Sequence, residues 1–258
     1  MPTTEERVEQ HLAIVTDEAR GLVARALAVG ATPASLADAV TAVYAYEEQT
    51  KAALVQALAR DPKCLPVCAA GCAFCCHLSV FASVPELLVL AAHLRATLTD
   101  AELAARTEAT VAAAAAVREL GQKERAAARR PCPLLGGLDG ATRQCGVYAA
   151  RPLACRAYNS CDAGVCEKAF DDAATHWDLP TDLFQLTVSR NARKGLISAV
   201  FAAGLDPGPY ELAPGLAVAL TIPDAARRWL AGERIFDAAE TRIGRERREG
   251  WRTEHAGG

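Results

Sequence analysis

All ten cysteines of this 258-residue chain lie in two short segments. The first segment runs from Cys64 to Cys76 and reads CLPVCAAGCAFCC, and the second runs from Cys132 to Cys166. Cysteines that only fill space in a core would be scattered along the chain, whereas thiolates that share a metal must converge. The clustering therefore predicts a cysteine-ligated metal site built from two separate parts of the sequence.

The second cysteine segment is poorly suited to regular structure. Eight prolines and glycines interrupt residues 131–166, and both residue types break helices and strands. Such a segment needs cross-links to become ordered. We expect its five cysteines to provide these cross-links by binding metal.

The rest of the chain shows the apolar spacing of helices. Two capping boxes, Ser83-Val84-Pro85-Glu86 and Thr99-Asp100-Ala101-Glu102, mark helix starts between the cysteine segments. We expect helices at residues 5–29, 33–60, 84–98, 100–129, 181–203, 211–220 and 223–240. No internal repeat or alternating strand pattern is present in the sequence. The predicted fold class is mainly α, with helices flanking a Cys-rich, loop-rich metal-binding core.

The same pattern predicts three regions that pack as one compact unit. Residues 1–62 form an N-terminal helical region, residues 63–170 a cysteine-cluster metal-binding domain, and residues 171–258 a C-terminal helical region. A chain of this length can bury a sizeable core.

The net charge and the hydropathy of the chain indicate which classes of partner and which cellular location to expect. The net charge is −3 and the arginines are interleaved with acidic residues, so we expect no nucleic-acid partner. The first residues, MPTTEERVEQ, lack the features of a signal peptide. No run approaches the ~20 apolar residues that span a bilayer, so we expect no membrane partner. We therefore expect a cytoplasmic location, where thiols stay reduced. In that compartment, closely spaced cysteines indicate metal or redox chemistry more often than structural disulfides.

The loop of the first segment has the spacing of an iron–sulfur site. Cys68, Cys72 and Cys75, with Phe74 before the third cysteine, resemble the three-cysteine loop of radical S-adenosylmethionine enzymes. In those enzymes the loop follows the first strand of a βα barrel, but helices precede it here and no strand–helix alternation follows. We therefore do not assign the chain to that class. The spacing still indicates that this loop can wrap an iron–sulfur cube.

Ligand counting leaves the number of centres open. Structural zinc takes four ligands, and a [4Fe–4S] cluster takes four thiolates, one per iron. Ten cysteines can supply one shared centre with thiols to spare, or one centre in each segment. Cys75 and Cys76 are adjacent and point in different directions, so one of them serves a second centre or a structural role. Packing as small apolar side chains remains an alternative, for Cys64, Cys161 and Cys166 above all. Disulfide bonding is a second alternative for the cysteines as a set, and the lack of a secretion signal weakens it.

Both segments together resemble the YkgJ-type cysteine-cluster family, a zinc- or iron-chelating domain named for its CxxCxxCC motif. The matching pieces, in order, are Gly71-Cys72-Ala73-Phe74-Cys75-Cys76, Ser83-Val84-Pro85-Glu86, Cys132-Pro133-Leu134-Leu135, Cys145-Gly146-Val147-Tyr148 and Arg151-Pro152-Leu153-Ala154-Cys155-Arg156-Ala157-Tyr158. The resemblance covers about residues 64–166. It departs at one point, because the family pattern places its first cysteine at position 69, where this chain has Ala69 and carries Cys68 instead.

The resemblance implies a set of metal ligands. Its motif cysteines are Cys72, Cys75, Cys76, Cys132, Cys145 and Cys155. Cys68 and Cys161 complete the eight candidate metal ligands. A branch of this family is associated with flagellin lysine methylation and an iron–sulfur cluster, but no Gly-rich loop after a predicted strand indicates a methyl-donor pocket here.

Three other residues have roles that the sequence leaves open. His77 follows the cysteine pair and either ligates a metal, bonds a thiolate or is an ordinary loop residue. Arg151 and Arg156 either offset the negative charge of thiolates or act as structural hydrogen-bond donors.

The sequence thus predicts a metal-binding protein that carries an iron–sulfur cluster, with [4Fe–4S] preferred, or Zn²⁺. The cube accounts for the three-cysteine loop, and surplus thiols suit redox chemistry. The first function we expect is metal handling, with metal ions as partners. The alternatives are an iron–sulfur-dependent protein-modifying enzyme of lysine-methylase type and a structural zinc module that binds a protein partner.

Overall fold

The computed structural model describes residues 4–28, 30–57, 64–136, 143–172 and 178–247. This part of the chain is mainly helical, which confirms the predicted fold class. The α-helices are α1 (Thr4–Ala26), α2 (Pro33–Ala57), α3 (Val84–Thr97), α4 (Asp100–Val117), α5 (Gln122–Ala128), α6 (Leu153–Ala157), α7 (Ala163–Asp171), α8 (Leu183–Ala202), α9 (Leu212–Thr221) and α10 (Ala225–Leu230). Short 3-10 helices are η2 (Phe74–His77), η3 (Tyr148–Ala150) and η4 (Ile235–Ala239). The strands β1 (Phe81–Ala82) and β2 (Tyr210–Glu211) pair antiparallel.

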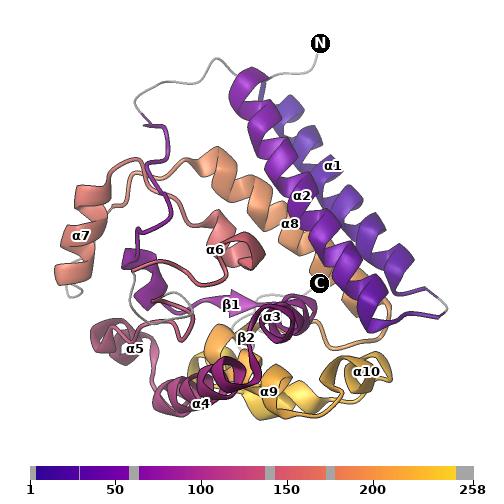
Figure 1. The fold of residues 1–258 in the computed structure, drawn as a ribbon. Helices are drawn as coiled ribbons and strands as arrows, with labels where there is room; N and C mark the ends of the chain where they lie inside the picture. The colour runs from indigo at the N-terminus through magenta and orange to yellow at the C-terminus, as the bar shows by residue number, and fades with distance from the viewer. Residues whose placement is uncertain (1–3, 29, 58–63, 137–142, 173–177, 248–258) are drawn as a thin grey trace.

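Three long helices form one layer of the fold. α1, α2 and α8 lie side by side, and α1 packs most extensively against α8 (Figure 1). The contact is tight because Gly195 on α8 has no side chain. A Cβ at this position would collide with the backbone carbonyl of Thr16 on α1.

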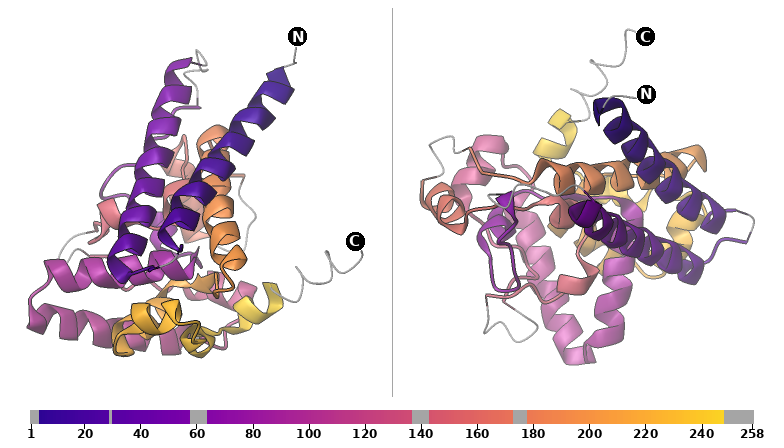
Figure 2. Two further views of the ribbon diagram at one scale, coloured as in Figure 1. Left: turned by 90° about the vertical axis from the view of Figure 1, so that its right-hand side faces the viewer. Right: turned by 90° about the horizontal axis from the view of Figure 1, so that it is seen from above.

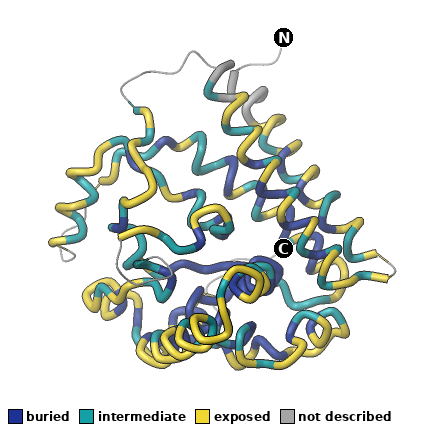
Figure 3. The backbone as a smooth tube through the Cα atoms, viewed as in Figure 1, coloured by how far each residue is buried: buried dark blue, intermediate teal, exposed yellow. Residues whose placement is uncertain are grey.

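A second layer lies across the ends of the first. It contains α3, α4, α9 and α10, and the left view of Figure 2 shows the N-terminal helices rising from it. Leu87 and Leu90 of α3 and Leu216 of α9 are fully buried between these elements. Buried positions concentrate where α3 meets the helices around it, whereas α7 shows none (Figure 3).

The cysteine segments occupy the side of the molecule where η2, α5, α6 and α7 lie (Figure 1). α6 packs on α8 and on β1, so the second cysteine segment is joined to both layers. Leu153 of α6 is fully buried and belongs to the same apolar core as Leu196 of α8 and Leu87 of α3.

Two predicted helices are interrupted. The helix expected over residues 100–129 is wrong, because α4 ends at Val117 and a separate α5 begins after Gly121, whose backbone N–H is bonded by Glu124. The helix expected over 223–240 is also wrong. It divides into α10 and η4 around Gly232, which has a φ of +87° that few other residues adopt. The expected end of the 33–60 helix lies outside the described residues.

None of the helices in the described ranges is both long enough and apolar enough to span a bilayer.

We predict that Gly195→Ala lowers the free energy of unfolding by about 1–3 kcal/mol, because the added methyl group forces α1 and α8 apart. Chemical denaturation followed by circular dichroism measures this change. Gly21→Ala on α1 is the matched control, because its methyl group would meet only the flexible end of Arg25 at 3.2 Å. Equal stability of the two variants would contradict the close packing described above.

Candidate metal centre

Backbone hydrogen bonds bring the two cysteine segments together. The N–H of Cys132 donates to the carbonyl of Cys76 at 2.8 Å, across 55 residues of chain that the helices α3 to α5 occupy. Leu135 then forms an antiparallel bridge with Cys145. These bonds place Cys76, Cys132 and Cys145 on chain segments that lie side by side. The predicted convergence of the two segments is therefore present.

Six thiols line one inner cavity, with a volume of about 320 Å³. They come from the loop before η2, from η2, from the segments around residues 132 and 145 and from α6, and are Cys72, Cys75, Cys76, Cys132, Cys145 and Cys155. The remaining wall is largely apolar. Most of the candidate metal donors that line the cavity are sulfur atoms, which suit iron–sulfur clusters and zinc.

The inner thiols hold their protons strongly. Burial raises the pKa of Cys132 to about 11, and burial also raises the pKa values of Cys145 and Cys155. The hydrogen bond with Cys76 is the largest cause that raises the pKa of Cys75. Because metals bind thiolates, a metal that enters this cavity must displace protons.

Two arginines place positive charge at the cavity wall. Arg151 lowers the pKa values of Cys75 and Cys145 and so opposes the effect of burial. Arg125 on α5 forms a buried ion pair with Glu211 of β2 at 3.0 Å and donates to the carbonyl of His77 at 3.2 Å. Arg125 therefore links α5 to His77, which follows Cys75 and Cys76. Both cations are suited to offset the negative charge of metal-bound thiolates.

Glu86 fixes the start of the helix that carries Cys155. Its Oε1 accepts a hydrogen bond from the backbone N–H of Leu153 at 2.6 Å, in the first turn of α6. Its Oε2 accepts bonds from the backbone N–H and the hydroxyl of Ser83, at 2.9 and 2.7 Å, at the start of α3. The side chain is fully buried. One carboxylate thus satisfies the N-termini of two helices, a role that the sequence motif indicated for α3 only.

A second group of thiols lines an outer cavity of about 230 Å³. Cys68, Cys72 and Cys166 reach it, together with Cys75. Cys68 is exposed, and its sulfur accepts a hydrogen bond from the N–H of Ser160 at 3.3 Å. Cys72 and Cys75 line both cavities, so the two thiol groups share a wall. Sequence reasoning left Cys166 out of the ligand set, although its place in the second cluster was a signal.

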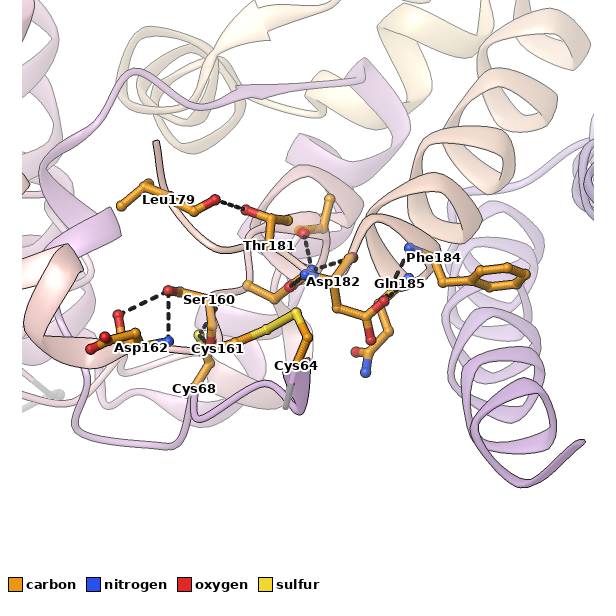
Figure 4. Close-up of a disulfide and its surroundings, with 12 residues drawn as sticks. Cys64, Cys68, Ser160, Cys161, Asp162, Leu179, Thr181, Asp182, Phe184 and Gln185 are labelled. Carbon is orange, nitrogen blue, oxygen red and sulfur yellow. Dashed lines mark hydrogen bonds between the residues drawn. A yellow bond between two sulfur atoms is a disulfide. The ribbon is translucent and has the colours of Figure 1, made fainter. Parts of the chain in front are cut away.

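The sulfur of Cys161, one of the predicted ligands, is bonded to that of Cys64 in a disulfide (Figure 4). A sulfur in this bond carries no thiolate charge and is no metal ligand while the bond is intact. The bridge ties the stretch before the motif loop to the loop that precedes α7. Cys68 lies beside it through its contact with Ser160 (Figure 4).

The eight predicted ligands therefore divide between three places. Cys76, Cys132, Cys145 and Cys155 line the inner cavity, Cys72 and Cys75 line both cavities, Cys68 lines the outer cavity, and Cys161 is in the disulfide. Among the residues that the structure describes, no three His, Cys, Asp or Glu side chains are arranged to hold a single metal ion.

The open roles of His77 and Arg156 can be described from their contacts. Nδ1 of His77 lies 3.1 Å from the carbonyl of Ala73, and its ring packs edge-on against Phe170 of α7. Arg156 donates to the carbonyl of Arg151 at 2.8 Å and is paired with Glu48 of α2. Arg156 is thus a structural link between α6 and α2.

The comparison with protein families agrees with this geometry. Residues 67–177 match the model of the CxxCxxCC family, whose description reads "Putative zinc- or iron-chelating domain". The match confirms the family resemblance over the cysteine region, and it supports a metal-binding role. No curated protein and no solved structure matches the chain.

We predict that Glu86→Ala lowers the free energy of unfolding by about 2–4 kcal/mol, because it leaves buried N–H groups of Ser83 and Leu153 without an acceptor. Metal content should fall with it, because α6 carries Cys155. Glu102→Ala is the matched control, since Glu102 caps α4 in the same way from an exposed position. The control should cost at most about 1 kcal/mol. Urea denaturation and metal analysis of both variants test this, and equal effects would contradict the joint role of Glu86.

Proposed function

We propose that this protein holds iron in its inner cavity as an iron–sulfur cluster, of the [4Fe–4S] type, and functions in metal handling. The observation that carries the proposal is the set of six thiols, from separate parts of the chain, that line one cavity of about 320 Å³. Four thiolates are enough for such a cluster, and two are surplus. The zinc- or iron-chelating description of the family supports the same class of ligand.

The spacing of the thiols favours a cluster over a single zinc ion. Structural zinc needs four donors gathered at about 2.3 Å from one point, and no three suitable side chains of the described residues have that arrangement. In a cluster each thiolate binds a different iron, so the sulfurs stand further apart.

The inner ligands also lie on elements that the fold fixes in place. Cys132 is bonded through its backbone to Cys76, and Cys155 lies on α6, which packs on α8. The fold therefore sets the spacing of these thiols.

Each part of the chain has a defined task in this proposal. Cys75, Cys132, Cys145 and Cys155 hold the metal, and Cys76 bonds the thiol of Cys75. Arg151 offsets negative charge, and the apolar wall keeps water away from the sulfurs. When bound, an iron–sulfur cluster supplies one-electron redox chemistry or an iron atom that acts as a Lewis acid.

A second candidate function is an iron–sulfur-dependent enzyme that modifies protein side chains. The specific observation in its favour is the apolar half of the inner cavity, which includes Leu78, Val80 and Leu212. Small-molecule sites commonly combine such a wall with a few polar groups, and this volume lies near the lower end of their range of roughly 300–1,000 Å³. A side chain held against this wall would lie next to the cysteines.

We predict that Cys132→Ser removes the inner metal. The test is elemental analysis with visible absorption, on protein purified without oxygen. The unchanged protein should be coloured and contain iron, and the variant should have lost both. Cys64→Ser is the control, because Cys64 lies outside the inner cavity, and it should retain the colour. A colourless protein that contains only zinc would overturn the cluster and favour a structural zinc module. Retention of iron in Cys132→Ser would overturn the assignment of this cavity.

A further inference from the structure

Arg193 on α8 holds part of its guanidinium group inside the protein without a hydrogen-bond partner. Its Nε is buried, and no described residue accepts a hydrogen bond from it. Within the described ranges Arg193 also forms no ion pair. Leaving a charged donor buried and unpaired is costly, so such groups are rare in folded proteins. An exception of this kind indicates a bound ion or a functional role.

A second arginine lies on the same face of α8. Arg190 precedes Arg193 by three residues, and residues at this spacing are neighbours on a helix surface. Arg190 is exposed whereas Arg193 is half-buried, so the pair leads from the solvent into the fold. α6 packs on α8, and Tyr158 follows the last residue of α6.

A third arginine comes from the C-terminal part of the chain. Arg247 lies in a helical segment that includes residues 242–247, and its guanidinium carbon is 4.4 Å from the ring centroid of Phe81 on β1. Arg242 and Arg245 of the same segment each pair with a glutamate. Arg247 has no acidic partner among the described residues. Because β1 also contacts α6, this third cation lies on the opposite strand of contacts to the same short helix.

The three guanidinium groups are close enough to influence one another and Tyr158. Burial lowers the pKa of Arg193, Glu86 opposes this shift, and the like charges of Arg247 and Arg190 lower the pKa further. Burial raises the pKa of Tyr158, and both of these arginines oppose that shift. Three positive charges from two elements therefore gather beside one tyrosine.

Glu86 does not balance this charge. Its two oxygens already accept bonds from Ser83, Leu153 and Tyr44, and it forms no ion pair with Arg193 in the described part of the chain. One carboxylate against three guanidinium groups leaves an excess of positive charge.

The chemistry of arginine indicates which ligand this charge suits. The planar guanidinium group presents paired N–H donors that match the oxygens of a carboxylate or a phosphate. Arg190 and Arg247 are exposed, so such a group can enter from solvent. Tyr158 lines both the inner and the outer cavity, so a group bound beside it would lie next to the cysteine region.

We propose that Arg190, Arg193 and Arg247 form, beside Tyr158, a binding site for the phosphate or carboxylate group of a small molecule. The site is separate from the metal centre proposed above, and it requires no metal. Because Tyr158 borders the inner cavity, the remainder of the bound molecule can extend toward the cysteines.

The test is thermal unfolding of the whole protein with increasing inorganic phosphate and, in a separate series, acetate. Ionic strength is kept constant with sodium chloride, because salt alone screens repulsion between the arginines. A ligand that binds only the folded state raises the melting temperature as its concentration rises, and this dependence gives the Kd. A saturating rise with phosphate indicates a phosphate-bearing ligand, and one with acetate indicates a carboxylate. No rise with either anion would overturn the proposal.

Arg193→Gln removes the buried cation and should weaken anion binding about 10–100-fold, as expected for loss of a hydrogen bond to a charged group. Lys194→Gln is the matched control. It removes the same charge from the next residue of α8, whose side chain lies with Glu9 and Asp17 at a different cavity. Equal Kd values for Arg193→Gln and the unchanged protein would overturn the site.

A surface variant covers the case in which Arg193→Gln does not fold. Arg247 and Arg245 are both exposed, so neither Arg247→Gln nor Arg245→Gln disturbs the core. Arg247→Gln should weaken anion binding, whereas Arg245→Gln should leave it unchanged. Equal weakening by both variants would show a general effect of net charge and would overturn the proposed set.

Cys132→Ser separates this site from the metal centre. It should lose the inner metal and still bind the anion with an unchanged Kd. Loss of anion binding together with the metal would show that the anion binds the metal, and would overturn the arginine site. Anion binding by protein that contains no inner metal supports the arginine site even where the proposed function fails.

Discussion

A buried carboxylate joins the helical scaffold to the cysteine region. Glu86 lies at the start of α3 and bonds the first turn of α6, so the position of Cys155 follows from the packing of α3 in the core. The hydroxyl of Tyr44 on α2 lies 3.4 Å from the same carboxylate. Replacing water around a charged group is costly unless hydrogen bonds compensate for it. The four bonds of Glu86 provide that compensation and fix three elements relative to one another.

The two thiol groups differ in how firmly the fold holds them. The inner thiols lie on α6 and on a loop that is hydrogen-bonded to the motif, whereas the outer thiols lie on an exposed loop and on a helix with no buried residue. The fold therefore fixes the positions of the inner thiols more firmly than those of the outer thiols. Cys72 and Cys75 border both cavities and so connect the two groups.

Sequence patterns predicted the parts of this arrangement that depend on local chemistry. The capping boxes at Ser83 and Thr99 start helices where expected, and the clustering of cysteines indicated a site made from two segments. The second bond of Glu86, to Leu153, joins residues 67 positions apart and has no sequence pattern. The placement of Cys166 beside Cys68 and Cys72 likewise depends on how α7 packs against η2. The sequence pattern did not predict the break at Gly121, because the alanines on both sides of it have strong helix propensity. The turn at this break is stabilised by one capping glutamate, Glu124.

The Cys64–Cys161 bridge closes a loop with a sequence separation of 97 residues, which contains the whole motif loop and every inner ligand. In the chain-entropy account, a cross-link around about 100 residues removes roughly 4–5 kcal/mol of freedom from the unfolded chain. The Cys64–Cys161 disulfide is a covalent cross-link that thiol reductants can open. The free energy of unfolding therefore depends on the surrounding redox potential, and the lifetime of the folded protein will differ between oxidising and reducing surroundings.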